Sequence, residues 1–260
     1  MDELLQRAAD WLAQARHAVV LTGAGLSTPS GIPDFRSREI GLWENFDPME
    51  IATFQAFRRQ PVDFFNWIRP LARQMFSAQP NLAHAALAEL EMAGRLTHVI
   101  TQNIDGLLQR AGVQRVIELH GDIHTGTCVN CYQVFRSEQF YSELIDEGRI
   151  PTCPDCGGII KPNVILFGEA LPVKALMAAR RASAACDVML IAGSSLEVAP
   201  AADLPMLARA HDAKIIIVNQ GATYLDEHCD VLIHDDVAVA LPALAAACLR
   251  RRTPNQHTQA

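Results

Sequence analysis

Residues 18–28 read AVVLTGAGLST, in which five apolar or β-branched residues lead directly into a glycine-rich turn. A strand followed by such a turn allows backbone N–H groups to approach a pyrophosphate, as in dinucleotide-binding sheets. The usual fingerprint, GxGxxG or GxGxxA, is broken at its last position by Thr28, so an ordinary strand–turn–helix connection explains the turn equally well. Pro29 and Pro33 oppose a helix directly after the turn and predict a loop over a bound ligand.

Short apolar runs recur along the chain and alternate with helical stretches rich in Ala and Leu. Two runs, residues 188–192 and 215–218, are continuously apolar, as expected for strands covered on both faces. The alternation predicts an α/β fold with a doubly wound parallel sheet of Rossmann type. The predicted strands are Ala18–Thr22, His98–Gln102, Val116–Leu119, Val188–Ala192, Lys214–Asn219 and Val231–His234. The predicted helices are Glu3–Arg16, Asn81–Ala93, Ile104–Ala111, Val173–Ala185 and Ala201–Ala210.

Two stretches interrupt this alternation and predict a second, smaller domain. Residues 37–79 hold half of the aromatic side chains and no clear strand, which indicates a helical excursion. Residues 127–159 hold two C-x-x-C pairs, which indicate a zinc-binding module. We therefore predict a Rossmann-type dinucleotide-binding domain from residues 1–36, 80–126 and 160–250. The small domain comprises residues 37–79 and 127–159, and residues 251–260 form a flexible tail.

Composition excludes several classes of protein. The 260 residues are 50% hydrophobic and 20% charged, so the chain can bury a full core. With 22 Lys and Arg against 29 Asp and Glu, the net charge of −7 argues against sequence-specific nucleic-acid binding. The acidic N-terminus lacks the apolar segment of a secretory signal, and the longest apolar run, residues 237–249, is too short to span a bilayer. We expect a cytoplasmic protein without a membrane partner.

The two C-x-x-C pairs are separated by 21 residues, a spacing typical of a tetrahedral zinc site. Four thiolates leave no coordination position open for water, so the metal is expected to be structural. A redox site needs only one such pair, and a zinc ribbon that binds nucleic acid needs more than the two arginines of residues 127–159. The predicted ligands are Cys128, Cys131, Cys153 and Cys156.

Polar or small side chains follow four of the predicted strands. They occur at residues 101–105, at His120, at residues 193–195 and at residues 219–220. The carboxyl ends of parallel strands meet at one edge of a sheet, where ligands bind in an open α/β fold. A single histidine is more often structural, but its coincidence with three other polar strand ends makes His120 a candidate catalytic residue.

Taken together, these motifs resemble those of the sirtuin family, the NAD-dependent protein-lysine deacylases. The resemblance runs from Gly23 to about Val237 and is greatest to the compact bacterial and archaeal members. Its motifs, in order, are GAGLS (23–27), GIPDFR (31–36), TQNID (101–105), HG (120–121), the paired C-x-x-C, FGE (167–169), GSS (193–195) and IVN (217–219).

The resemblance implies that NAD and a protein bearing acetyl-lysine meet between the two domains, with one structural Zn²⁺ in the smaller. The implied NAD contacts are Gly23, Ala24, Gly25, Ser27, Thr28, Asp34, Phe35, Arg36, Gln102, Asn103, Ile104, Asp105, His120, Gly193, Ser194, Ser195, Asn219, Gln220 and Val237. The implied contacts to the substrate peptide are Ile165, Phe167, Gly168, Glu169 and Val198.

The implied reaction transfers the acyl group from lysine to ADP-ribose, releasing nicotinamide and O-acetyl-ADP-ribose. His120 is expected to act as general base, since an imidazole titrates near neutral pH, while Asn103 and Asp105 orient the reactants. A mono-ADP-ribosyltransferase that uses the same NAD site is the main alternative. A hydride-transferring dehydrogenase gives no reason for the cysteine pairs, and a non-catalytic zinc-ribbon protein gives none for the polar strand ends.

Overall fold

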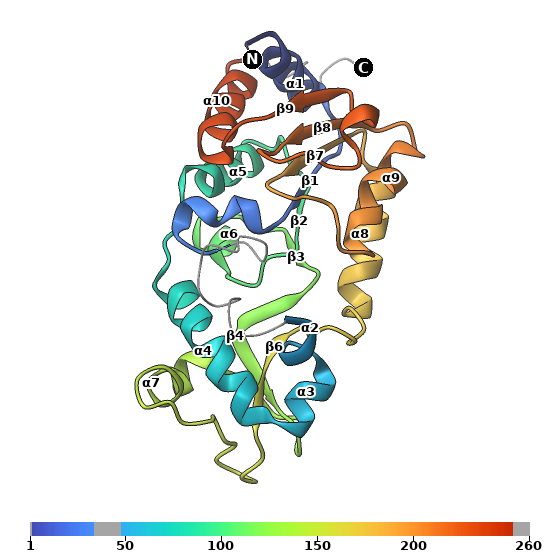
Figure 1. The fold of residues 1–260 in the computed structure, drawn as a ribbon. Helices are drawn as coiled ribbons and strands as arrows, with labels where there is room; N and C mark the ends of the chain where they lie inside the picture. Colours follow the sequence, from blue (N-terminus) through green and yellow to red (C-terminus); the bar gives the residue numbers. More distant parts are fainter. Residues whose placement is uncertain (1, 34–47, 252–260) are drawn as a thin grey trace, which may run out of the picture.

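The computed structural model describes residues 2–33 and 48–251, and its central feature is a parallel sheet of six strands in the order β3-β2-β1-β7-β8-β9 (Figure 1). All of its strand pairs are parallel, and the register aligns Thr22 at the end of β1 with Thr101 of β2 and Ala192 of β7. The six strands match the predicted ones, with ends that differ by at most one residue. They are β1 (Ala18–Thr22), β2 (His98–Thr101), β3 (Val116–Glu118), β7 (Val188–Ala192), β8 (Lys214–Val218) and β9 (Val231–Ile233).

The direction in which strands are added to the sheet reverses between β1 and β7. From β1 the chain builds outward through β2 to β3, and it then returns to the other side of β1 for β7, β8 and β9. Connections on the two sides of such a reversal diverge to opposite faces, and this opens a crevice at the carboxyl ends of the strands. The predicted Rossmann-type fold is therefore confirmed.

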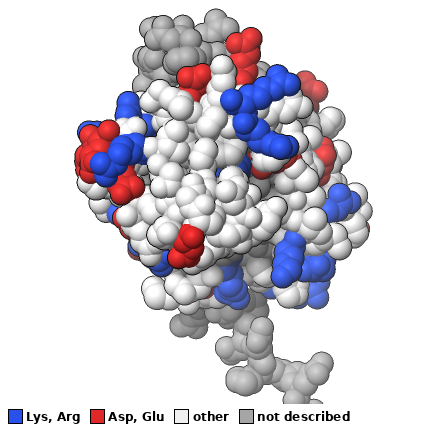
Figure 2. All heavy atoms as spheres, turned by 90° about the horizontal axis from the view of Figure 1, so that it is seen from below, with Lys and Arg blue, Asp and Glu red and all other residues white. Residues whose placement is uncertain are grey.

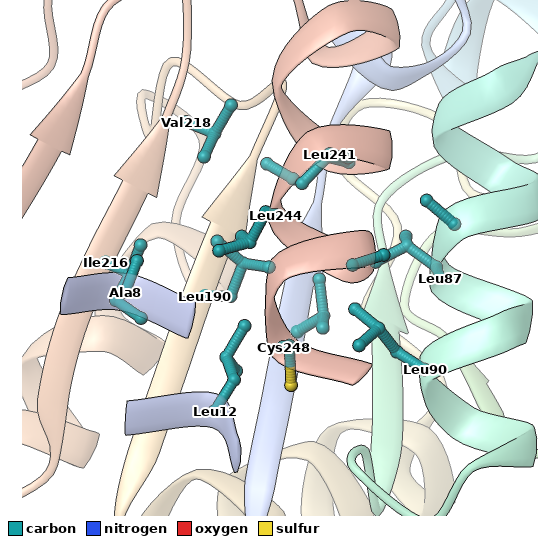
Figure 3. Close-up of a cluster of buried hydrophobic side chains, with 14 of the residues drawn as sticks. Ala8, Leu12, Leu87, Leu90, Leu190, Ile216, Val218, Leu241, Leu244 and Cys248 are labelled. Carbon is teal, nitrogen blue, oxygen red and sulfur yellow. The ribbon is translucent and has the colours of Figure 1, made fainter. Parts of the chain in front are cut away.

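Helices cover both faces of the sheet, as its continuously apolar strands require (Figure 1). One face is covered by α1 (Asp2–Gln14), α5 (Leu82–Met92) and α10 (Val237–Leu249), and the other by α8 (Val173–Ala185) and α9 (Leu204–Arg209). In α10, Leu241, Leu244 and Cys248 pack among sheet residues and side chains of α1 and α5 (Figure 3). The apolar run at residues 237–249 is thus a core helix, and no helix among the described residues is long and apolar enough to cross a membrane.

Two predicted helices differ from the observed ones for local reasons. The helix expected from residue 104 is limited to α6 (Leu107–Arg110), because Gly106 has a φ of +69° and the Asp105 carboxylate caps the Leu107 N–H. The stretch 201–210 divides into a 3₁₀ turn, η4 (Ala201–Asp203), and α9. After β1 the chain forms two 3₁₀ turns, η1 (Ala24–Leu26) and η2 (Thr28–Ser30), instead of an α-helix, as the prolines predict.

The remaining described elements form a smaller body below the sheet in Figure 1. The helical excursion is confirmed over residues 48–77, where four aromatic side chains build a separate core: Phe57, Phe64, Phe65 and Trp67. Its helices and turns are α2 (Pro48–Ile51), α3 (Phe54–Arg59), α4 (Pro61–Ser77), η3 (Ser137–Phe140) and α7 (Tyr141–Ile145), while η5 (Asp226–His228) belongs to the loop before β9.

A three-stranded antiparallel sheet, β5-β4-β6, accompanies these helices and was not predicted. Its strands are β4 (Gly121–Cys128), β5 (Val134–Arg136) and β6 (Ile160–Val164). The sequence of β4, GDIHTGTC, lacks apolar alternation because a bulge between its two glycines shifts the register against β6. The predicted domain boundaries at residues 126 and 160 stay a prediction, and β4 crosses the first of them.

Candidate active site

The floor of the crevice is built from glycine backbone at the ends of β1 and β7. The Gly25 N–H donates to the Gly193 carbonyl at 2.9 Å, and the Gly23 N–H donates to the Ala192 carbonyl at 3.3 Å. A Cβ on Gly25 would lie 2.9 Å from the Gly193 oxygen, and one on Gly193, whose φ is +62°, would lie 2.3 Å from the Leu26 nitrogen. Side chains are excluded here because the two turns touch, and the part of the β1 turn that a ligand could reach is the half-buried backbone of Ala24 and Gly25.

A buried polar network lies beneath this floor and joins the β1 turn to the segment after β2. The Asn103 side-chain amide donates to the Gly23 carbonyl at 3.0 Å and to Ser27 Oγ at 3.1 Å. The Ser27 hydroxyl donates to Asp105 Oδ2 at 2.6 Å, and the Leu107 N–H donates to Oδ1 at 2.9 Å. Ser27 and Asp105 are 1% and 4% exposed, so the carboxylate is held by two hydrogen bonds out of water.

His84, at the start of α5, also belongs to this network and was not predicted as a site residue. Its Nδ1 accepts the Asn81 backbone N–H at 3.3 Å, so the hydrogen of the neutral ring is on Nε2, which lies 3.5 Å from Ser27 Oγ. Burial lowers the pKa of His84 to about 4, although the charge of Asp105 acts in the opposite direction. A histidine in place of the usual Glu or Gln at the third position of a capped helix was the available sequence signal.

The neutrality of His84 predicts an acid-sensitive fold. With a pKa of about 4 when folded and 6.5 when unfolded, the unfolded chain binds the extra proton between these values, so stability falls as pH falls through that window. Going from about pH 7.5 to about pH 5 should cost about 2 kcal/mol through this residue alone. Urea unfolding at the two pH values should show that His84→Gln loses about 2 kcal/mol less unfolding free energy on acidification than the wild type does. The control His17→Gln, at an exposed site, should lose as much as the wild type. An unchanged acid loss in His84→Gln would contradict the assignment.

His120 lies between β3 and β4, at the same edge of the sheet. Its Nδ1–H donates to the Gln102 carbonyl at 3.0 Å, and this leaves Nε2 as the basic nitrogen of the neutral ring. Burial lowers the pKa of His120, with the hydrogen bond to Gln102 acting in the opposite direction. At neutral pH the ring is therefore an uncharged base of fixed tautomer.

The backbone around His120 is fixed by the segment after β6. The His120 carbonyl accepts the Ile165 N–H at 2.9 Å, and a Cβ on Gly121, whose φ is +74°, would lie 1.8 Å from the Asn163 oxygen. Only glycine fits at residue 121, which explains the His-Gly pair in the sequence.

The other half of the crevice carries further predicted residues. The Gln102 amide donates to Ser194 Oγ at 2.9 Å, which links the ends of β2 and β7. Asn219 is buried and donates to the Gly221 carbonyl at 2.7 Å. Gln220 is exposed beside it, whereas the Val237 side chain packs in the core at the start of α10.

The remaining predicted contacts lie at the rim or beyond the described residues. Ala24 and Thr28 lie in the turns after β1, where the Thr28 hydroxyl donates to the Gly25 carbonyl at 3.1 Å. Ile104 and Ser195 are half-buried in the loops after β2 and β7. Asp34, Phe35 and Arg36 lie outside the described residues.

The predicted peptide segment, residues 165–169, lies next to the site through the bond between Ile165 and His120. The Phe167 backbone bonds to the linker between α2 and α3: its N–H donates to Ala52 at 2.9 Å, and its carbonyl accepts from Phe54 at 3.1 Å. Phe167 and Val198 are 44% and 43% exposed, so both apolar residues are accessible from outside.

The four paired cysteines converge at the end of β4 opposite His120. Their sulfur atoms all lie within 4.8 Å of one another, with 3.4 Å between Cys128 and Cys156 and 3.7 Å between Cys131 and Cys153. Tetrahedral zinc with bonds of about 2.3 Å requires sulfur separations of about 3.8 Å, so the residues fit this metal. The eight residues of β4 separate the cluster from His120 by roughly 20 Å, too far for zinc to activate a water in the crevice.

Comparisons with known proteins agree with this geometry. A protein deacylase of Archaeoglobus fulgidus, "NAD-dependent protein deacylase 2", is 43% identical over 97% of this chain and 99% of its own. "NAD-dependent protein deacetylase 1" of Geobacillus kaustophilus is 43% identical over 86% and 90%. A Sir2 structure solved with a p53 peptide and NAD⁺ superposes with a TM-score of 0.82, at 39% identity over 91% of this chain and 95% of that one.

Another Sir2 enzyme structure has a TM-score of 0.89, at 43% identity over 97% of this chain and all of that one. The sequence model of the Sir2 family matches residues 23–200 of this chain. The matched range contains the glycine turn, the polar network, His120 and the cysteine cluster. The chain belongs to the Sir2 family.

Proposed function

We propose that the protein is an NAD-dependent protein-lysine deacetylase, which transfers the acetyl group from lysine to ADP-ribose and releases nicotinamide and O-acetyl-ADP-ribose. The observation that carries this proposal is the neutral, half-buried His120 with its basic Nε2 at the edge of a glycine-floored crevice. One related Sir2 structure was solved with a deacetylated p53 peptide and 3'-O-acetyl ADP-ribose, the products that this reaction predicts. NAD and acetyl-lysine proteins are the partners.

The residues divide between the two halves of the dinucleotide. The backbone of residues 23–28 would hold the pyrophosphate, and Ser194, Ser195 and Asn219 would bind the adenosine half. Gln102 bridges to Ser194 and would hold the nicotinamide ribose. Asp34, Phe35, Arg36, Gln220 and Val237 complete the predicted NAD contacts.

On the nicotinamide side, Asn103, Ile104 and Asp105 would line the pocket. The hydrogen bonds of Asn103 to Gly23 and of Ser27 to Asp105 fix these side chains before a ligand arrives. Such preorganisation removes the cost of ordering them during the reaction. Their role is to orient, because Asp105 already accepts two hydrogen bonds and is nearly inaccessible.

Bound NAD supplies an electrophilic ribose carbon and nicotinamide as the leaving group. His120 Nε2 would take a proton from a ribose hydroxyl, which makes that oxygen the nucleophile toward the acyl carbon. The Nδ1–H bond to the Gln102 carbonyl fixes the tautomer and stabilises the imidazolium that results. The cysteine cluster would hold zinc, and the metal would stabilise the fold without taking part in the reaction.

Mass spectrometry separates this function from mono-ADP-ribosylation at the same NAD site. We expect an acetyl-lysine peptide to lose its acetyl group only when NAD is present, with O-acetyl-ADP-ribose formed in equal amount. A peptide that instead gains ADP-ribose would identify the alternative, and deacetylation without NAD would contradict both.

The pH dependence of the reaction gives a second test. A general base must be unprotonated, and burial places the pKa of His120 below 6.5, so kcat/KM should stay level around neutral pH and fall only under acid conditions. We expect a slope of about one on the acid side when the rate is measured from about pH 5 to about pH 8. Circular dichroism at each pH distinguishes loss of the base from the acid unfolding expected from His84. A decline that begins above about pH 7 would contradict the role.

The surface and the thiols bear on partners and location. On the face shown in Figure 2, described Lys and Arg residues lie around a largely uncharged centre, some beside Asp and Glu and others grouped without them at the lower right. The net charge of −7 supports a protein rather than a nucleic-acid partner. None of the seven cysteines, all of which lie in the described residues, forms a disulfide, which favours the reducing cytoplasm as its compartment.

A further inference from the structure

An ion pair closes the turn that carries the predicted peptide segment. Lys161 Nζ lies 3.0 Å from Glu169 Oε2, and the two side chains are only 13% and 20% exposed. Lys161 comes from β6, before the segment, and Glu169 ends it. The pair therefore joins the two ends of residues 161–169 out of reach of most solvent screening.

Both charges are also bonded to the backbone between them. The Lys161 ammonium donates to the carbonyls of Val164 at 2.9 Å and Pro162 at 3.3 Å. Glu169 Oε2 accepts the Leu166 N–H at 2.8 Å, and the Glu169 N–H donates to the Leu166 carbonyl at 3.0 Å. The Glu169 carboxylate is thus directed into the protein.

The bonds of this pair fix a segment that is already held at two other points. Ile165 bonds to the His120 carbonyl and Phe167 to the α2–α3 linker, so the pair supplies the remaining restraint at the end of the segment. Gly168, with a φ of +84°, allows the chain to turn back so that Glu169 reaches Lys161. The Phe167 side chain is left facing outward.

We propose that Lys161 and Glu169 are positioning residues for the acyl-lysine peptide, an inference that rests on the proposed function. A peptide that binds as an added strand gains affinity from backbone hydrogen bonds, and these require a receiving segment of fixed shape. A preformed segment spares the peptide the cost of ordering it. A shielded pair whose charges are both hydrogen-bonded has one favourable geometry, so it selects one shape of the segment.

The test compares the effect of each variant on peptide affinity with its effect on NAD affinity. Fluorescence anisotropy with a labelled acetyl-lysine peptide should show at least about a fivefold weaker Kd for Glu169→Gln and about tenfold for Lys161→Met, while NAD binding by calorimetry stays within about twofold. KM for the peptide should rise in parallel with little change in kcat. The double variant should lose little more than Lys161→Met alone, because the two residues act as one pair.

Glu169→Gln keeps the size of the side chain and an acceptor for Leu166, so it tests the charge even where Lys161→Met fails to fold. Lys214→Met is the matched control: Lys214 pairs with Asp230 at 3.2 Å between β8 and β9, far along the sheet, and its loss should leave peptide affinity unchanged. Unchanged peptide affinity in a folded Glu169→Gln, or equal losses for NAD and peptide, would overturn the proposal. An inactive wild type would instead overturn the proposed function.

Discussion

Replacing His120 by alanine is expected to lower kcat/KM for an acetyl-lysine peptide by about a thousandfold, roughly 4 kcal/mol in the transition state. The bond from Nδ1 to the Gln102 carbonyl fixes the imidazole at the crevice edge and leaves Nε2 as its basic nitrogen. Alanine removes the proton acceptor and leaves the backbone bond between His120 and Ile165 in place. The fold and the zinc site should therefore survive.

Three measurements make the result specific. Zinc content and melting temperature of His120→Ala should match the wild type, and NAD binding should stay within about tenfold. The matched control is His98→Ala, which removes a half-buried histidine at the opposite end of β2 and should retain nearly full activity. A His120→Ala enzyme with more than about a tenth of wild-type kcat/KM would show that another group takes the proton.

The inner strands of the large sheet, β1, β2, β7 and β8, could be predicted because nearly all of their residues are buried, which leaves a clear apolar run such as residues 188–192. The edge strands β3 and β9 are only partly buried, and short apolar runs predicted them. Strands β4 and β5 of the small sheet could not be predicted. In β4 the bulge between Gly121 and Gly126 breaks the alternation that identifies a half-buried strand, and β5 is mostly exposed. Neither the bulge in β4 nor the exposed position of β5 can be inferred from the sequence, because both depend on how the strands pair.

The features of the site likewise divide into those that the sequence predicts and those that it does not. The meeting of four polar strand ends follows from parallel pairing, and for that reason His120 and Gln102 could be placed at one edge before any coordinates. The bonds of Ser27 to Asp105 and of Lys161 to Glu169 depend on side-chain directions that no spacing in the sequence states. His84 was missed because it lies inside a predicted helix, where a histidine is usually without function.

Replacing Cys128 or Cys153 by serine is expected to release zinc and unfold the three-stranded sheet. Structural zinc in small modules contributes on the order of 10 kcal/mol, comparable with the whole stability of a domain. Apolar packing at this end of the molecule is small: Cys128, Cys153 and Ile160 are the buried members of their cluster, packed against the partly buried Phe135 and Phe140. Atomic absorption and circular dichroism should show both losses together.

Deacetylation should fall at least about a hundredfold in these variants, although the metal lies roughly 20 Å from the reaction. The reason is continuity of the chain, because β4 begins directly after His120 and pairs with β6, which leads into the peptide segment. Cys229→Ser, outside the cluster, should keep zinc and activity. Metal exchange then separates folding from chemistry: Co²⁺ or Cd²⁺ in the site should support wild-type kcat, since four thiolates leave no position for a reactant. A kcat that depends on which metal is bound would show that the metal takes part in the reaction. Full activity without metal would show that the fold does not require zinc.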